Sequence, residues 1–253
     1  MKKIMLVILM SCISMLAMAQ NKTYKIGDYY NDGNGVRGYV FEVSADGRHG
    51  KIVQCRLRNG GKLLDAGYPD LIKAGVPEMR YSNGEPAYIG LPVQLLWVGA
   101  TSKTDGAANT EKLWNRWKEL KSKYNFGKTY LSDIEEALKN ANYYDALSPW
   151  SEKWYIPAIE ELNSFYAAVA QDDLNQLIKD DVMNSDHMGE ISDKESFWEK
   201  FFKIPQGLFW SSTQLPDSEK QEPLWFVLDM RDGTDCVYEP NGWRYWFILI
   251  RRF

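Results

Sequence analysis

The clearest periodic pattern of the chain begins at Pro157. Apolar residues recur after it at spacings of three and four, which is typical of a helix with one buried face: Ile159, Leu162, Tyr166 and Val169, with Phe165 beside them. Pro157 suits the first helical turn, because its missing N–H needs no partner there. Glu160 and Glu161 follow, where the helix dipole favours negative charge. We predict a central helix here, with the later strands packed against it.

Before this helix, the runs Gly38–Val43 and Gly50–Cys55 are rich in β-branched and aromatic residues. Asp46-Gly47 lies between them, so we predict a β-hairpin. Asn59–Leu91 contains prolines and glycines without a sustained period, but also apolar residues that need burial. We interpret it as an ordered loop insertion at about residues 59–91. Leu95–Val98 is predicted as a short strand.

Two further helices are predicted between the hairpin and Pro157. The first runs from Glu111 to about Lys123, with Asn109 or Thr110 as its cap and Leu113, Trp117 and Leu120 facing inward. The second opens at the capping box Ser132–Glu135. Helical periodicity resumes between residues 174 and 202.

The C-terminal part is rich in strand signals. We predict strands at Gly207–Thr213 and Leu224–Met230, a hairpin turn at Asp232-Gly233 and a return strand at Cys236–Tyr238, before a last strand at Tyr245–Ile250. The order is an N-terminal β-hairpin, central helices and a C-terminal antiparallel meander, which is an α+β fold and not a doubly wound sheet.

Four pieces in this order carry a resemblance to a known family. They are Gly38–Phe41 with Gly47–Val53, the motif Trp154-Tyr155-Ile156-Pro157 with Glu161-Leu162, the run Phe209–Thr213 that contains Trp210-Ser211-Ser212, and Trp225–Val227 through Gly233 to Tyr245–Arg252. The chain resembles the family named for the C-terminal domain of Legionella collagen-like adhesins, the Lcl C-terminal domain, a domain of unknown function. It is also similar to the related Fibrobacter major paralogous domain.

The resemblance covers most of residues 24–253 outside the loop insertion. It implies a C-type lectin-like fold with the chain ends paired in one sheet, so we expect Tyr39–Val43 to pair with Tyr245–Ile250. It also implies export and a surface or adhesion role, and it supplies no catalytic residues. We expect residues 20–253 to form a single lectin-like domain.

Residues 1–19 have the features of a signal peptide. Lys2 and Lys3 precede an apolar run, and Ala17-Met18-Ala19 matches a cleavage site before Gln20. The alternative is a lipoprotein signal with Cys12 acylated. The protein is therefore predicted to be exported, to the periplasm, the outer surface or the medium. No later segment has the apolar length of a membrane helix.

The formal net charge of −4 becomes −6 once Lys2 and Lys3 are removed. Without a basic excess, a nucleic-acid partner is not expected. In an oxidising compartment Cys55 and Cys236 either form a disulfide or remain two separate thiols. Two cysteines with His49 and His187 do not have the ligand spacing of a zinc site.

The candidate reactive groups have structural explanations. Glu160 and Glu161 are adjacent, so on a helix they diverge and do not form an acid–base pair. Ser211 and Ser212 lack the glycines of a nucleophile elbow, and we expect their hydroxyls to bond backbone groups. His49 is expected to be exposed. No catalytic residues are predicted.

Glu239-Pro240-Asn241 resembles the calcium-binding tripeptide of C-type lectins. Its oxygens suit calcium, but six or more are needed, and Asp229, Asp232 and Asp235 are the nearest further carboxylates. We favour a simple turn at Pro240 and Asn241-Gly242 over a calcium site. The candidate ligand-binding residues are Glu239, Asn241 and Trp243. No metal site is assigned, and calcium is the one cofactor that we consider.

We predict a structural role for the motif residues, in which Trp154, Ile159, Leu162, Trp210 and Trp225 form one buried cluster. The alternative is an exposed tryptophan platform for sugars. The favoured function is a non-catalytic binding or adhesion module for a surface glycan or protein. The other candidate is an enzyme on the same fold, of the formylglycine-generating type or a hydrolase.

Overall fold

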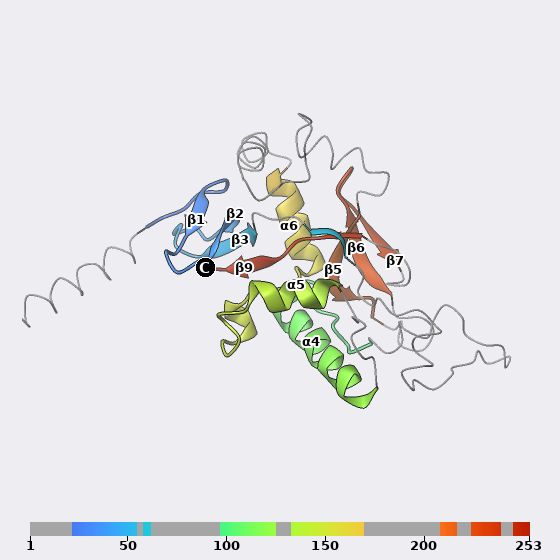
Figure 1. The fold of residues 1–253 in the computed structure, drawn as a ribbon. Helices are drawn as coiled ribbons and strands as arrows, with labels where there is room; N and C mark the ends of the chain where they lie inside the picture. Colours follow the sequence, from blue (N-terminus) through green and yellow to red (C-terminus); the bar gives the residue numbers. More distant parts are fainter. Residues whose placement is uncertain are drawn as a thin grey trace, which may run out of the picture.

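A computed structural model describes residues 22–54, 58–61, 97–124, 133–169, 208–216, 224–238 and 245–253. Within these residues the chain is a mixed α+β fold, as predicted (Figure 1). The strands are β1 (Tyr29–Asn31), β2 (Arg37–Val43), β3 (Gly50–Gln54), β4 (Arg58–Gly61), β5 (Leu208–Gln214), β6 (Trp225–Asp229), β7 (Thr234–Tyr238), β8 (Tyr245–Phe247) and β9 (Ile250–Arg252). The helices are α4 (Gly106–Lys123), α5 (Asp133–Ala141), α6 (Ile159–Val169) and the 3₁₀ turn η1 (Trp150–Glu152).

The first sheet has the order β1-β2-β3-β9, and all its pairs are antiparallel. The predicted hairpin is confirmed as β2 and β3. Gly47 in its turn has φ +71°, a conformation that favours glycine. The last strand pairs with β3 through Ile52↔Arg251 and Val53↔Ile250. The predicted pairing of Tyr39–Val43 with the C-terminal strand is therefore wrong, because β3 lies between them.

The second sheet has the order β4-β8-β5-β6-β7. Strands β5, β6 and β7 form the predicted antiparallel meander. The run Tyr245–Ile250, predicted as one strand, is divided: β8 pairs parallel to β5 through Phe209↔Trp246, whereas Ile250 belongs to β9 in the first sheet. The predicted insertion begins as strand β4, which pairs with β8 although its sequence contains no strong β-former. Residues 62–91 lie outside the described part.

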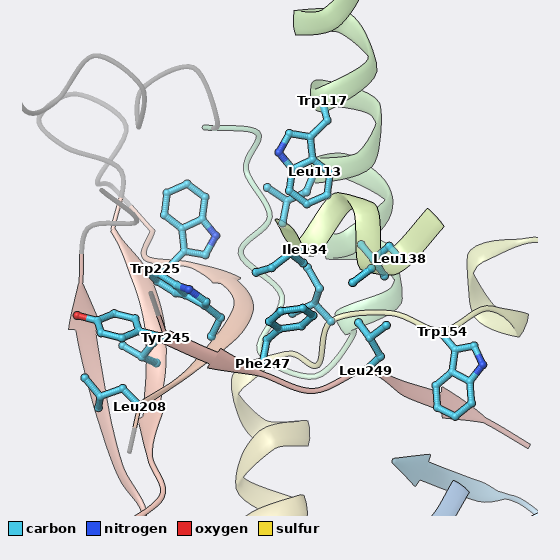
Figure 2. Packing of buried hydrophobic residues seen from close by; sticks show 14 of the residues in the cluster. Leu113, Trp117, Ile134, Leu138, Trp154, Leu208, Trp225, Tyr245, Phe247 and Leu249 are labelled. Atoms are coloured by element: carbon cyan, nitrogen blue, oxygen red, sulfur yellow. The ribbon is translucent and has the colours of Figure 1, made fainter. Parts of the chain in front are cut away.

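Two buried cores lie on opposite faces of the second sheet, because successive strand residues point to opposite sides. The α4 core contains Trp210 and residues from α4 and α5 such as Leu113 and Ile134, which converge in Figure 2. The α6 core contains Phe209 and Leu162. All five residues of the predicted cluster are buried, but Trp154, Trp210 and Trp225 belong to the α4 core and Ile159 and Leu162 to the α6 core. The prediction that these five residues form a single cluster is therefore wrong.

Helix α4 begins five residues earlier than predicted, at Gly106, and Asp105 is its cap. Asn109 and Thr110 are therefore not its caps: both lie inside the helix, and their side chains bond other segments. The Asn109 amide bonds the backbone of Ser102, and the Thr110 hydroxyl bonds the N–H and C=O of Ile156. The inward positions Leu113, Trp117 and Leu120 are confirmed as buried.

The other helices differ less from the sequence analysis. Helix α5 begins at Asp133, within the predicted box, whose Ser132 is outside the described residues. Helix α6 begins at Ile159, so Pro157 precedes its first turn. Of the predicted strand Leu95–Val98, only Trp97 and Val98 lie in the described part, and they are not in a strand. The amides of Val98 and Ala100 donate to the Gln214 side chain instead. The helical segments predicted between residues 174 and 202 lie outside the described part.

Candidate functional site

The segment Trp154–Ile156 is extended and passes between the two cores. The side chains of Trp154 and Ile156 lie in the α4 core, and that of Tyr155 lies in the α6 core. The backbone of Tyr155 exchanges two hydrogen bonds with Ile250, of 2.9 and 3.0 Å. Each of these three residues is at most 4 % exposed to solvent. This part of the motif therefore joins the helices, both cores and the C-terminal strand.

Glu161 holds this junction together through its buried carboxylate, which is 2 % exposed. Oε2 accepts from the N–H groups of Gly106 at 3.0 Å and Ala158 at 2.9 Å. Oε1 accepts from the Tyr155 hydroxyl at 3.0 Å and lies 3.3 Å from Nζ of Lys51. The bond to Ala158 is the return half of a capping box. Glu161 therefore connects α6, the start of α4 and strand β3.

The hydroxyl groups of the three residues after Trp210 also form hydrogen bonds with backbone groups of neighbouring segments. Ser211 Oγ donates to the carbonyl of Phe226 at 2.7 Å, and Ser212 Oγ donates to that of Pro157 at 3.1 Å. Thr213 Oγ1 accepts from the Ile159 N–H at 3.0 Å, which satisfies a free amide at the start of α6. The predicted backbone-bonding role of Ser211 and Ser212 is confirmed.

Gly106 lies where α4 meets this junction, and no side chain fits there. A Cβ atom at this position would lie 2.5 Å from Ala158 N, Ile156 O and Glu161 Oε2. Glycine to alanine inside a helix normally stabilises by about 1 kcal/mol. Here we expect Gly106→Ala to lower the melting temperature, because backbone atoms cannot move aside cheaply. Thermal unfolding by circular dichroism measures this, and an unchanged or raised melting temperature would contradict the packing described.

A cavity of about 450 Å³ opens beside α4, and we call it the α4 groove. One wall is the face of α4 that carries Glu111, Trp114, Asn115 and Lys118, which share a face because they are three, four and seven residues apart. The other wall comes from residues 146–153 and from Arg252 of β9. The complete lining is Asp105, Ala107, Ala108, Glu111, Trp114, Asn115, Lys118, Ala146, Ser148, Pro149, Trp150, Ser151, Lys153 and Arg252.

Two half-buried tryptophans meet in the α4 groove. The rings of Trp114 and Trp150 are edge to face, with centroids 5.7 Å apart. Lys153 Nζ lies 5.2 Å from the centre of the Trp150 ring and donates to the carbonyl of Ala146 at 2.9 Å. This lysine therefore fixes η1 against the preceding turn. The groove combines an aromatic wall with exposed carboxylate, amide and ammonium groups.

One end of the groove is formed by an ion pair. Arg252 donates to Asp105 Oδ1 at 3.0 Å, and that oxygen also accepts from the N–H of Ala108. The guanidinium of Arg252 lies 5.6 Å from the centre of the Tyr155 ring. Burial, with the charge of Glu161, raises the pKa of Tyr155 well above its usual value, so its hydroxyl remains a donor to Glu161. Arg252, which lines the groove, thus links it to the buried junction at Tyr155.

The ligand candidates that we inferred from the sequence, Glu239, Asn241 and Trp243, lie outside the described residues. Of the nearby carboxylates, Asp229 pairs with Arg231, which lowers the pKa of the aspartate. Within the described residues, no group of three His, Cys, Asp or Glu side chains is placed to hold a metal ion. The calcium hypothesis therefore stays a prediction about residues 239–241.

The remaining candidates do not converge on the groove. His49 is exposed in the turn between β2 and β3, as predicted. Cys236 carries a free thiol on β7, whereas Cys55 and His187 lie outside the described residues. Neither cysteine nor histidine occurs among the described groove residues.

Sequence reasoning missed the α4 groove, although part of its signal was present. Glu111, Asn115 and Lys118 recur at helical spacing on the face away from Leu113 and Trp117. Trp114 lies at the edge of that face, where its ring contacts that of Trp117. A tryptophan on the polar face of a helix is unusual enough to mark a surface of interest. The wall opposite α4 could not be inferred, because Arg252 and Asp105 are 147 residues apart.

Comparison with protein-family models and with curated proteins finds no match to this chain. The resemblance to the Lcl C-terminal domain therefore stays a prediction. Within the described part of the chain, no helix is long and apolar enough to cross a membrane.

Proposed function

We propose that this protein is an exported, non-catalytic binding module of the bacterial cell envelope or surface, and that the α4 groove holds its ligand. The observation that carries the proposal is the pair Trp114 and Trp150, half-buried beside polar side chains in a cavity of about 450 Å³. Aromatic walls with a few polar groups that fix orientation are typical of ligand sites. The signal-like residues 1–19 and the resemblance to adhesin domains support export and a surface role.

A carbohydrate is the ligand class that we favour over a protein. Tryptophan rings present flat apolar surfaces that suit the C–H faces of sugars, while Glu111 and Asn115 supply acceptors and donors for hydroxyl groups. Both side chains are exposed. A cavity of this size also falls within the range of small-ligand sites, about 300–1,000 Å³. The C-type lectin-like fold that we infer for residues 20–253 agrees with this ligand class.

A glycan array probed with the protein tests the proposal. We expect a defined set of glycans to bind, and binding to fall at least about tenfold in the double variant Glu111→Ala/Asn115→Ala, because each lost hydrogen bond is worth about 1 kcal/mol. Both residues are exposed, so the melting temperature should not change. Glu119→Ala is the matched control: it removes a carboxylate from the same helix outside the groove. Glycan binding that is equal in the double variant and the wild type would contradict the assignment.

A further inference from the structure

Three large apolar side chains project from the turn between α5 and η1. Tyr143, Tyr144 and Leu147 are 73 %, 94 % and 102 % exposed, and we call them the apolar tip. The next most exposed large hydrophobic side chain among the described residues is Tyr29, at 44 %. Figure 1 shows the yellow-green segment after α5 at the edge of the molecule. The tip is therefore a convex projection and not part of a core.

The backbone that carries the tip is held firmly. Asn142, at its start, exchanges two hydrogen bonds with the backbone of Trp154, of 2.8 and 2.9 Å. The N–H of Asp145 bonds the carbonyl of Asn142, and that of Ser148 bonds the carbonyl of Asp145. Lys153 donates to the carbonyl of Ala146. Because this turn is already ordered, docking through its side chains costs little further conformational entropy.

Two cations at the base of the tip, Arg251 and Lys153, already have partners within the protein. Arg251 forms an ion pair with Asp145, and the Lys153 ammonium is bound to a carbonyl and lies over the Trp150 ring. The whole chain has a formal net charge of −4. Within the described turn itself, residues 142–149, no side chain is basic, so the tip offers apolar area without a basic cluster that would attract anionic lipid.

The size and chemistry of the tip indicate what it contacts. The surface area that three side chains on one turn can bury is much less than the roughly 800 Å² that each partner buries in a stable protein interface. A fluid surface, in contrast, needs no complementary pocket for a projecting group. Tyrosine prefers the boundary between water and hydrocarbon, where its ring is buried and its hydroxyl stays hydrated. Leucine supplies apolar area for insertion below that boundary.

We propose that the apolar tip inserts into the interfacial region of a lipid bilayer with zwitterionic headgroups and docks the protein on a membrane surface. Tyr144 and Leu147 enter the bilayer interface, and Tyr143 lies beside them, since its ring contacts that of Tyr144 with centroids 5.1 Å apart. Ala146, Ser148 and Pro149 of the same turn line the α4 groove. Docking therefore places the mouth of the groove close to the lipid surface.

Co-sedimentation with phosphatidylcholine vesicles tests this proposal. We expect the wild type to bind weakly and reversibly, and the partition coefficient to fall at least about tenfold in Tyr144→Ser/Leu147→Ser, since these side chains carry most of the exposed apolar area. Binding should change little between about 50 and 500 mM salt, because it does not rest on charge. Both side chains are almost fully exposed, so the melting temperature should be unchanged.

The matched control is Ile26→Ser/Val237→Ser, which removes two apolar side chains that are 41 % and 40 % exposed elsewhere on the surface. All variants are compared in the same N-terminal form, verified by intact mass, because the apolar run Ile4–Leu16 would itself bind lipid if retained. Three results would overturn the proposal: absence of wild-type binding, equal binding by the tip variant, or binding that requires anionic lipid. Loss of a wild-type dimer in the tip variant, with vesicle binding unchanged, would identify a protein interface instead.

Discussion

Replacing Glu161 by alanine is expected to lower the free energy of unfolding by about 3–5 kcal/mol, the usual cost of removing one partner of a buried ion pair. The change would leave the N–H groups of Gly106 and Ala158 and the Tyr155 hydroxyl without their acceptor. It would also leave Lys51 with only the more exposed Glu42 as a counter-charge. Urea unfolding of the purified protein measures the loss. It is a large share of a typical stability of about 5–15 kcal/mol.

Glu160→Ala is the matched control for this experiment. Glu160 is the neighbouring residue in the same helical turn, has the same charge and is exposed. Its favourable interaction with the helix dipole is worth about 0.3–1 kcal/mol, so its removal should cost no more than that. Equal losses in the two variants would mean that Glu161 acts only through the helix dipole and does not hold the junction.

Trp210→Ala is expected to cost about 3–5 kcal/mol, the range observed when a buried aromatic side chain is truncated. Trp210 is fully buried in the α4 core, and its ring centre lies 4.7 Å from that of Tyr245. Thermal unfolding should show a clearly lower melting temperature. Tyr144→Ala provides the contrast, because this aromatic residue is 94 % exposed and should have almost no effect.

The same experiment separates the two interpretations of the tryptophan motif. Trp154, Trp210 and Trp225 are 4 %, 0 % and 0 % exposed, so they cannot present a face to a sugar in the folded protein. Any loss of ligand binding in Trp210→Ala should therefore accompany loss of structure. Unchanged melting together with abolished binding would show that the motif is itself a ligand site.

The elements that could be predicted from the sequence are those with local causes. The β2–β3 hairpin has its turn residues Asp46-Gly47 between two runs of β-formers, and the β6–β7 hairpin has Asp232-Gly233. The buried face of α4 follows from its helical period. In each case the residues that determine the element are close together in the sequence, so the pattern alone is sufficient.

The elements that were predicted wrongly depend on distant partners. The run Tyr245–Ile250 is continuous in sequence, but it is divided because its first part pairs with β5 in the second sheet and Ile250 pairs with β3 in the first. Asn109 and Thr110 have side chains typical of helix caps, but in the structure they lie inside the helix and bond the backbone of Ser102 and Ile156. The periodicity of apolar residues along the chain gives no information about these contacts between distant segments. The α4 groove was missed for the same reason, since its walls come from three separate segments.

We propose that the buried tryptophans form the scaffold and that Trp114 and Trp150 contact the ligand. A two-dimensional NMR titration of the indole N–H signals, assigned with single Trp→Phe variants, distinguishes these two roles. When a glycan selected by the array is added, we predict that the signals of Trp114 and Trp150 shift most and those of Trp154, Trp210 and Trp225 stay in place. Shifts confined to Trp210 and Trp225, with Trp114 and Trp150 unaffected, would contradict this assignment of roles.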